Sequence, residues 1–239
     1  EQGFRYLNKF NSNIIINIKK KLNLMPGFFW FSLDDLESLI KKKNTLNMDT
    51  ISVFSSFIKK TKFDKPQNSL AKINHLIKLN DKKFFIKKKI IPLYKLKDWN
   101  FTPSYISHKK NKHFSIIGTK ILTNKREVNK WCQPIIKGKG LAMAGFLIKE
   151  INKTPHYLCR YILKPGLKKS VITCTVNTSD IKNYKIDQNL STYQKKLFEF
   201  FLSNKKINKN NKTLYNNILS DEGGRFYHCQ IKNIAILIK

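Results

Sequence analysis

Three short segments of this sequence carry side chains that could hold a phosphorylated or sugar-like ligand or move a proton. In the first, residues 126–134, Arg126, Trp131 and Gln133 lie within eight positions. An indole ring beside a guanidinium can stack on a base or a sugar ring while the charge holds a phosphate. The alternative is that Trp131 anchors the core, and the sequence leaves both roles open.

The second segment runs from Asp221 to His228 and contains a Gly-Gly pair followed by Arg225 and Tyr227. Paired glycines let the backbone approach a phosphate closely, and they also form ordinary turns. Under either interpretation the turn carries an arginine, a tyrosine and a histidine into a terminal hairpin.

The third candidate is His156, which strand alternation places on one face with Leu158 and Arg160. A single histidine on a strand is commonly a hydrogen-bonded core residue, and it can also act as a general acid or base. The sequence contains none of three common active-site motifs: a serine-nucleophile elbow, a Walker loop or a dinucleotide glycine fingerprint.

Cysteine spacing argues against a metal centre. Cys132, Cys159, Cys174 and Cys229 are far apart and form neither a C-x-x-C pair nor a zinc-like pattern with histidine. We therefore expect reduced thiols in a cytoplasmic protein, with no metal and no cofactor.

Net charge is the most prominent property of the composition. The 239 residues include 47 basic and 15 acidic side chains, which gives +32 at pH 7. Only four of the basic residues are arginines, at positions 5, 126, 160 and 225, and the lysines are spread along the whole chain. Lysine excess of this kind is typical of codon drift towards A and T. We therefore expect a solvated surface that binds nucleic acid only non-specifically and in a salt-dependent way.

A hydrophobic content of 41%, with 12% aromatics, is enough for a core, so the chain as a whole is expected to fold. No run of 18 apolar residues occurs, so we expect no transmembrane helix, and no signal peptide is recognisable. The chain begins at Glu1 rather than Met, which suggests a fragment or a processed product.

Two helices are expected near the N-terminus. Ser32 can cap the first, which ends in the lysines of residues 41–43. Asp49 can cap the second, which ends near Lys60. Residues 61–82, with a short helix at 70–79, are interpreted as a connection. We therefore expect an N-terminal helical arm or linker of residues 1–82, followed by a domain of residues 83–239.

From Phe84 onward the sequence changes to short apolar runs separated by turns, which indicates strands. Residues 150–155 are typical of a hairpin loop between antiparallel neighbours. Ser191 and Gln194 form a capping box for a helix that would cover the sheet, and residues 203–213 are expected to be a loop. The fold class is therefore α/β or α+β, with helices on a mixed sheet. The expected strands are residues 84–86, 113–117, 141–151, 156–163, 171–176 and 231–238.

Taken in order, these segments resemble the NDP-hexose 2,3-dehydratase family over most of the chain. The most specific strings are REV-x-x-W-x-QP at 126–134 and EGGRFYH at 222–228, at this separation. The weaker matches are Trp30-x-Ser32-Leu33, Asn47-Met48-Asp49, Ile91-Pro92-Leu93, Trp99, Ile106-x-His108, Gly145-Phe146-Leu147, His156, Pro165-Gly166 and Thr175-Val176.

The resemblance implies a Nudix-like mixed sheet flanked by helices, and a chain that corresponds to the second of two tandem copies. It also implies a homodimer or a second repeat as partner, and a dTDP-sugar as substrate. The expected activity is a dTDP-4-keto-6-deoxyhexose 2,3-dehydratase of deoxysugar biosynthesis, a metal-free elimination in which the C3 proton is removed and the C2 hydroxyl leaves. By the same resemblance His156 or Tyr227 moves protons. The nucleotide sugar is held by Arg126, Trp131, Gln133, Asn177, Glu222 and Arg225.

The chain departs from the family after His156. Family members carry a Q-A-K-x-E-P-G run there. At the matching places this chain has Arg160 for the amide, Ile162 for the lysine and Lys164 for the carboxylate. The expected P-T-V-Q run likewise ends in Asn177 instead of glutamine. Two alternatives follow: a divergent or partial enzyme, or a non-catalytic structural or nucleic-acid-associated basic protein that reuses the fold.

Overall fold

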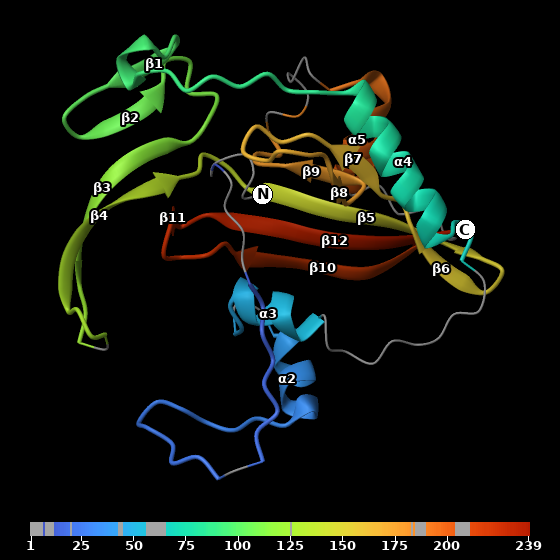
Figure 1. The fold of residues 1–239 in the computed structure, drawn as a ribbon, viewed down its shortest axis with the longest axis horizontal. Coiled ribbons are helices and arrows are strands. Elements are labelled where there is room, and N and C mark those ends of the chain that lie inside the picture. The colour runs from blue at the N-terminus through green and yellow to red at the C-terminus, as the bar shows by residue number, and fades with distance from the viewer. Residues whose placement is uncertain are drawn as a thin grey trace. The chain divides into compact units, whose positions relative to one another are not determined.

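The computed structural model describes residues 7, 12–19, 21–42, 45–55, 66–124, 126–182, 184, 190–203 and 211–239. The chain divides into two compact units, Phe10–Lys62 and a larger unit of Glu1–Lys9 with Phe63–Lys239. The larger unit holds every described strand (Figure 1). Every residue predicted for the site also belongs to it. The domain boundary expected at residue 82 stays a prediction. No helix in these ranges is long and apolar enough to cross a membrane.

The first helix of the smaller unit, α2 (Leu33–Ile40), confirms the predicted cap. The Ser32 hydroxyl accepts a hydrogen bond from the Asp35 backbone N–H at 3.1 Å, and the Asp35 carboxylate accepts one in return from the Ser32 N–H at 3.0 Å. This reciprocal pair satisfies two backbone donors that the first turn of a helix leaves without partners.

The second helix, α3 (Met48–Ser55), begins one residue before the expected cap, Asp49. The Asn47 side-chain oxygen accepts a hydrogen bond from the Thr50 N–H at 2.9 Å, so Asn47 is the capping residue and the assignment to Asp49 was wrong. Asp49 instead lies in the first turn, where a carboxylate favours the positive end of the helix dipole. The expected end near Lys60 lies outside the described residues.

In the larger unit, α4 (Leu70–Lys83) confirms the helix expected at 70–79 and extends it. Ser69 caps it, its hydroxyl accepting a hydrogen bond from the Lys72 N–H at 3.2 Å. The strand expected at 84–86 was wrong, because these residues pair with no strand in the described part of the chain. An apolar run becomes a strand only where its backbone can form hydrogen bonds with a neighbouring strand. Residues 84–86 are followed by extended chain and then by the short 3-10 helix η1 (Leu93–Lys95).

The first sheet has five strands in the order β1-β2-β3-β4-β11. The first four pair antiparallel and β11 joins β4 in parallel, so a segment near the C-terminus completes a sheet that begins near residue 99. Its strands are β1 (Trp99–Phe101), β2 (Tyr105–His108), β3 (Ser115–Leu122), β4 (Lys130–Lys137) and β11 (Phe226–Tyr227).

The second sheet runs β10-β12-β5-β6, with β9 also paired to β5. The pair β12–β5 is parallel and the other pairs are antiparallel, which confirms a mixed sheet and an α+β fold (Figure 1, yellow to red). A separate hairpin joins β7 to β8. The strands are β5 (Ala142–Ile151), β6 (Thr154–Tyr157), β7 (Arg160–Ile162), β8 (Val171–Thr173), β9 (Val176–Thr178), β10 (Lys212–Ser220) and β12 (Gln230–Ile238).

The strands expected at 141–151 and 231–238, and the hairpin between β5 and β6, are confirmed. Asn152 and Lys153 form its turn with φ of 52° and 59°. The runs expected at 156–163 and 171–176 each break in two, because Thr175 interrupts the ladder. Its hydroxyl accepts from the Leu147 N–H at 2.9 Å and donates to the Leu158 carbonyl at 2.5 Å.

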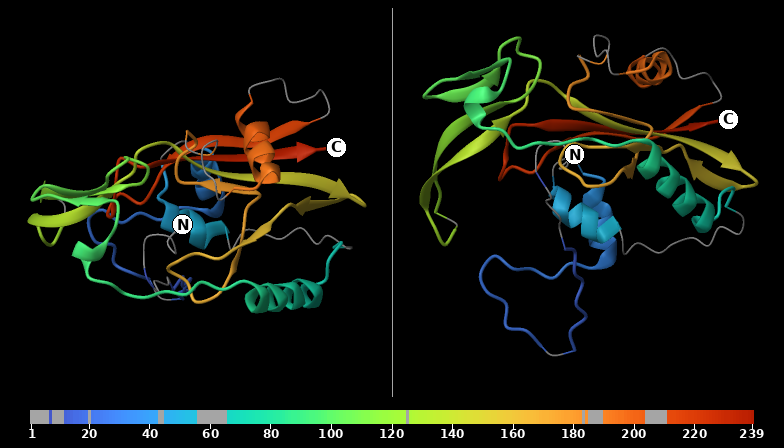
Figure 2. Two further views of the ribbon diagram at one scale, coloured as in Figure 1. Left: turned by 90° about the horizontal axis from the view of Figure 1, so that it is seen from above. Right: turned by 45° about the horizontal axis from the view of Figure 1, so that its top comes forward.

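The helix α5 (Thr192–Leu202) lies against one face of the second sheet (Figure 2). Its predicted capping box between Ser191 and Gln194 is present. The loop expected at 203–213 is only partly tested, since residues 204–210 lie outside the described ranges and β10 already begins at Lys212. The buried residues that join helix and sheet are Met143, Leu147, Val176, Tyr184, Phe198, Phe201, Ile234 and Ile236.

Candidate functional site

Strand register places several of the predicted site residues on one face of the first sheet. Residues in direct register share a face, and side chains alternate along a strand. On β4 this puts Trp131, Gln133 and Lys137 on the same face, and Tyr227 is in register with Lys137 from β11. The Lys137 ammonium lies 6.0 Å from the centre of the Tyr227 ring. We call the side chains of Trp131, Gln133, Lys137 and Tyr227 the β4 face.

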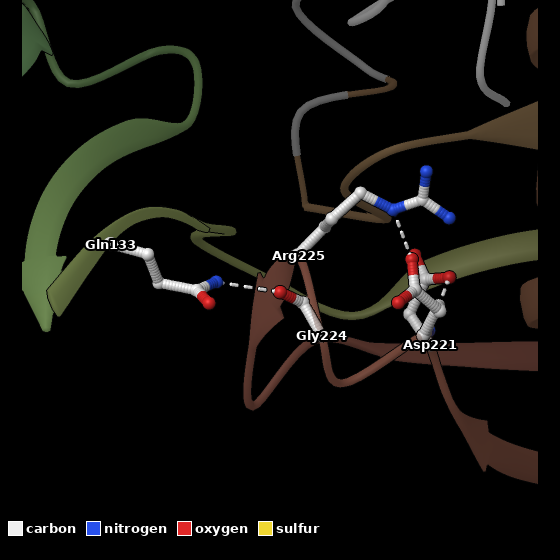
Figure 3. A network of polar contacts seen from close by, with 5 residues as sticks. Gln133, Asp221, Gly224 and Arg225 are labelled. Carbon is white, nitrogen blue, oxygen red and sulfur yellow. Dashed lines mark hydrogen bonds and ion pairs between the residues drawn. The ribbon is translucent and has the colours of Figure 1, made fainter. Parts of the chain in front are cut away.

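Gln133 joins β4 to the Gly-Gly turn. Its side-chain oxygen accepts a hydrogen bond from the Trp131 indole N–H at 2.7 Å. Its amide N–H donates to the Gly224 carbonyl at 2.7 Å, as Figure 3 shows. The two most specific strings of the sequence therefore meet in space. The Ile136 N–H adds a backbone hydrogen bond to the Arg225 carbonyl at 2.9 Å.

Arg126 lies over the exposed side of Trp131. Its guanidinium carbon is 5.8 Å from the centre of the indole ring, within the range of a cation–π contact. Together with Glu127 and Val128 the pair lines an open hollow of about 680 Å³. Trp131 is only half-buried, so its ring faces this hollow and does not anchor the core.

The Gly-Gly turn is held by contacts among its own residues. The Arg225 guanidinium forms an ion pair with the Glu222 carboxylate, and the Glu222 N–H donates to the Asp221 carboxylate at 2.9 Å (Figure 3). A side chain at position 224 would place its Cβ 2.6 Å from a Glu222 carboxylate oxygen. A Cβ at position 224 would therefore move the Glu222 carboxylate, which is already engaged by Arg225.

His156 lies on β6, and both of its ring nitrogens are engaged. Its Nε2 accepts a hydrogen bond from the Gln67 N–H at 2.9 Å, and its Nδ1 lies 2.8 Å from the Thr154 carbonyl. This arrangement assigns the neutral tautomer with the proton on Nδ1, which donates to Thr154. In this geometry the ring ties β6 to the segment that precedes α4.

The structure does not bring His156 and Tyr227 together. His156 is in register with Lys149 near one end of β5. At the other end, Ala142 is in register with Ile231, four residues after Tyr227. The strand between Ala142 and Lys149 is about 23 Å long at roughly 3.3 Å per residue. Asn177 belongs to the second sheet, in register with Ala144, and not to the β4 face.

The segment that departs from the family forms the β7–β8 hairpin, where Lys164 is buried. On β7 the Nε atom of Arg160 is buried without a hydrogen-bond partner among the described residues. Desolvation lowers the pKa of Arg160, an effect that the nearby Cys174 thiol partly offsets. Elsewhere in the described ranges no group of three or more His, Cys, Asp or Glu side chains is placed to hold a metal ion.

Sequence reasoning missed Lys137, although period-2 alternation from Trp131 would have placed it on the same face. It also missed that Trp99 and His108 form an aromatic cluster with His113, with ring centres 4.8–6.3 Å apart. Register places Trp99 and His108 on the sheet face opposite Gln133. The residues that carry the resemblance therefore lie on both faces of the first sheet.

The sequence was compared with protein families and with curated proteins. The family model described as NDP-hexose 2,3-dehydratase matches residues 1–57 and 70–239. A dTDP-4-dehydro-6-deoxy-alpha-D-glucopyranose 2,3-dehydratase of Saccharopolyspora spinosa is 24% identical and is aligned over 96% of this chain and 51% of its own length. Proteins of the same name from Streptomyces violaceoruber and Amycolatopsis orientalis are 23% and 24% identical, each over 99% of this chain. They are covered over 54% and 49% of their lengths, so the chain spans about half the length of these relatives.

Proposed function

The chain belongs to the NDP-hexose 2,3-dehydratase family, and on that premise we propose that it binds a dTDP-4-keto-6-deoxyhexose and takes part in its 2,3-dehydration. The relatives that carry this activity in their names are about twice as long, so the activity of this chain is part of the proposal. The observation that supports it is the meeting of the two most specific strings on and beside the β4 face.

The reaction is an elimination that needs acid–base groups and hydrogen-bond donors. The C4 ketone acidifies the C3 proton, a base removes that proton, and the C2 hydroxyl leaves with a proton as water. The enol product tautomerises to a 3,4-diketo-2,6-dideoxy sugar. Donors near the C4 oxygen stabilise the negative charge that develops there.

We assign the proton-moving role on the β4 face to Tyr227, whose phenol is exposed and lies beside Lys137. Arg126 and Trp131 line the hollow that would take the base and the diphosphate of the nucleotide. Lys137 supplies a further positive charge on the same face. A catalytic role for His156 stays a prediction, and it would require the ring to release the Gln67 N–H.

The proposal extends to assembly and compartment. It includes a Nudix-like fold and a homodimer or a second repeat as partner; the coverage of only half of each relative supports the partner. Large apolar side chains that a partner could cover are exposed in residues 14–31, among them Ile16, Phe29 and Trp30. A cytoplasmic location is supported by the four free cysteines.

The test combines turnover with ligand binding. The purified chain is incubated with dTDP-4-keto-6-deoxyglucose, a 3-ketoreductase and NADPH, and the products are searched for a 2-deoxy sugar. Binding of dTDP is measured by calorimetry in parallel. We expect dTDP binding and turnover; a chain that shows neither would contradict both the enzymatic and the ligand-binding role.

A pair of lysine variants locates the ligand on one side of the sheet. Lys137→Met removes a charge from the β4 face, whereas Lys120→Met removes the same charge from the opposite face, where Lys120 is in register with Cys132. Lys137 lies beside Tyr227, six residues from Trp131 along β4, or about 20 Å at roughly 3.3 Å per residue, so its charge would face the sugar and not the diphosphate. One exposed charge beside a ligand contributes about 1 kcal/mol, so we expect Lys137→Met to weaken binding of dTDP-4-keto-6-deoxyglucose roughly fivefold and binding of dTDP less. Lys120→Met should bind as the wild type does, and equal losses in the two variants would argue for a general charge effect.

A further inference from the structure

The Gln133 side chain is engaged at both ends by protein groups. A primary amide offers two N–H donors and one oxygen acceptor. The oxygen takes the Trp131 indole N–H and one N–H goes to the Gly224 carbonyl, each at 2.7 Å. These contacts join two segments that lie 91 residues apart in the sequence. One bond at each end of the amide, two of the four that it can form, is thus already made before any ligand arrives.

We infer that Gln133 is a positioning residue: it fixes the Trp131 ring and the Gly223–Gly224 turn relative to one another and does not itself bind the sugar nucleotide. This inference rests on the proposed function, because the ring and the turn matter as parts of a ligand site. It revises the expectation that Gln133 holds the ligand.

The chemistry of the contact explains why an amide is needed. Glutamate could accept the indole N–H, but its second oxygen would face the Gly224 carbonyl, and two acceptors repel. Asparagine is one methylene shorter and cannot span both partners. Leucine has a similar volume and offers neither contact, so both the indole N–H and the carbonyl would lose their partner.

The contacts of Gln133 affect both arginines that flank the site, Arg126 and Arg225. Trp131 carries the Arg126 guanidinium over its ring, and the Gly-Gly turn carries the ion pair of Arg225 with Glu222. One amide therefore sets the spacing between the supports of two arginines. Loss of the amide should loosen the ring and the turn without removing any charge.

The first experiment needs no ligand. Acrylamide quenching of Trp131 is measured as the fluorescence difference between each protein and its Trp131→Phe counterpart, which cancels the other two tryptophans. We expect Gln133→Leu and Gln133→Asn to increase the quenching of Trp131. Gln230→Leu, the same change at an exposed position of β12, should leave quenching unchanged. Unchanged quenching in both Gln133 variants, with melting temperatures that show them folded, would overturn the inference.

The second experiment separates positioning from direct contact. A lost hydrogen bond of this kind is worth about 1 kcal/mol, so Gln133→Leu should weaken dTDP binding roughly five- to tenfold. If Gln133 acts through Trp131, the loss is smaller when Trp131 is already Phe. An equal loss in both backgrounds would show that Gln133 does not act through the Trp131 ring and would overturn the inference. If the wild type binds no dTDP, the proposed function fails, while the quenching experiment still tests whether Gln133 positions the Trp131 ring.

Discussion

A substitution at Gly145 tests how closely α5 packs on the second sheet. Gly145 lies on β5 and is buried. A Cβ atom added there would lie 2.8 Å from a Phe201 ring carbon and 2.8 Å from a Val176 methyl carbon. Ordinary van der Waals contacts of a Cβ fall at 3.4–4 Å, so the new atom would overlap both neighbours.

The magnitude follows from how little these neighbours can move. Phe201 is 3% exposed and Val176 is 1% exposed, so both are enclosed by the core that α5 forms with the sheet. Overpacking of a well-packed core costs about 1–3 kcal/mol. Alanine regains roughly 0.5–1 kcal/mol over glycine in a strand, because the unfolded chain loses less freedom. The net loss expected for Gly145→Ala is therefore about 1–2 kcal/mol.

The measurement is a thermal melt followed by circular dichroism. For a chain of this size about 1 kcal/mol shifts the melting temperature by roughly 2–4 °C, so the melting temperature of Gly145→Ala should fall by about 2–8 °C. Gly118→Ala is the matched control, because a Cβ at this position of β3 meets no atom within 4 Å. It should melt at the wild-type temperature or slightly above. If the two variants melted alike, α5 would not lie against β5 as described.

Two further predictions concern the Gly-Gly turn and the N-terminal side of the larger unit. Gly224→Ala should weaken dTDP binding, measured by calorimetry, because the new Cβ would displace the Glu222 carboxylate. The control is Gly223→Ala, whose Cβ meets no atom within 4 Å and which should bind dTDP as the wild type does. Equal affinities of the two variants would contradict this role of the turn. Hydrogen bonds from the Ser170 side chain and backbone hold the pKa of Asp81 below its ordinary value. A depressed pKa stabilises the fold above the unfolded value near 3.8, and that stabilisation is lost as the pH falls through the folded value. Asp81→Asn should therefore melt below the wild type at neutral pH and approach it below pH 3.8, and a gap that is constant with pH would refute this assignment.

Local signals in the sequence predicted local structure. The cap at Ser32, the capping box at Ser191 and the turn at Asn152 depend on residues within three positions, and the structure contains all of them. The strand β4 was not predicted, because Gln133 and Pro134 interrupt its apolar pattern. Its position depends on register with β3 and β11, which no local window contains.

Long-range contacts also decide the roles of the candidate residues. His156 accepts a hydrogen bond from Gln67, 89 residues away, so its engagement could not be read from the pattern on its own strand. The same holds for the link from Gln133 to Gly224. Residue types therefore predicted which side chains deserve testing, whereas register and long-range hydrogen bonds determine which of them can act together.

The few arginines of the chain differ from its many lysines in what surrounds them. Three of them are described, and each has a contact or a setting that depends on the planar guanidinium or on burial. Arg126 lies over the Trp131 ring, Arg225 pairs with Glu222, and Arg160 has a buried Nε atom. A lysine has no planar group to lie over an indole ring and no Nε–H beside a second nitrogen. In the described part of a chain whose other basic residues are lysines, these three arginines therefore stand where the planar group makes a contact or is buried, and two of the three flank the β4 face.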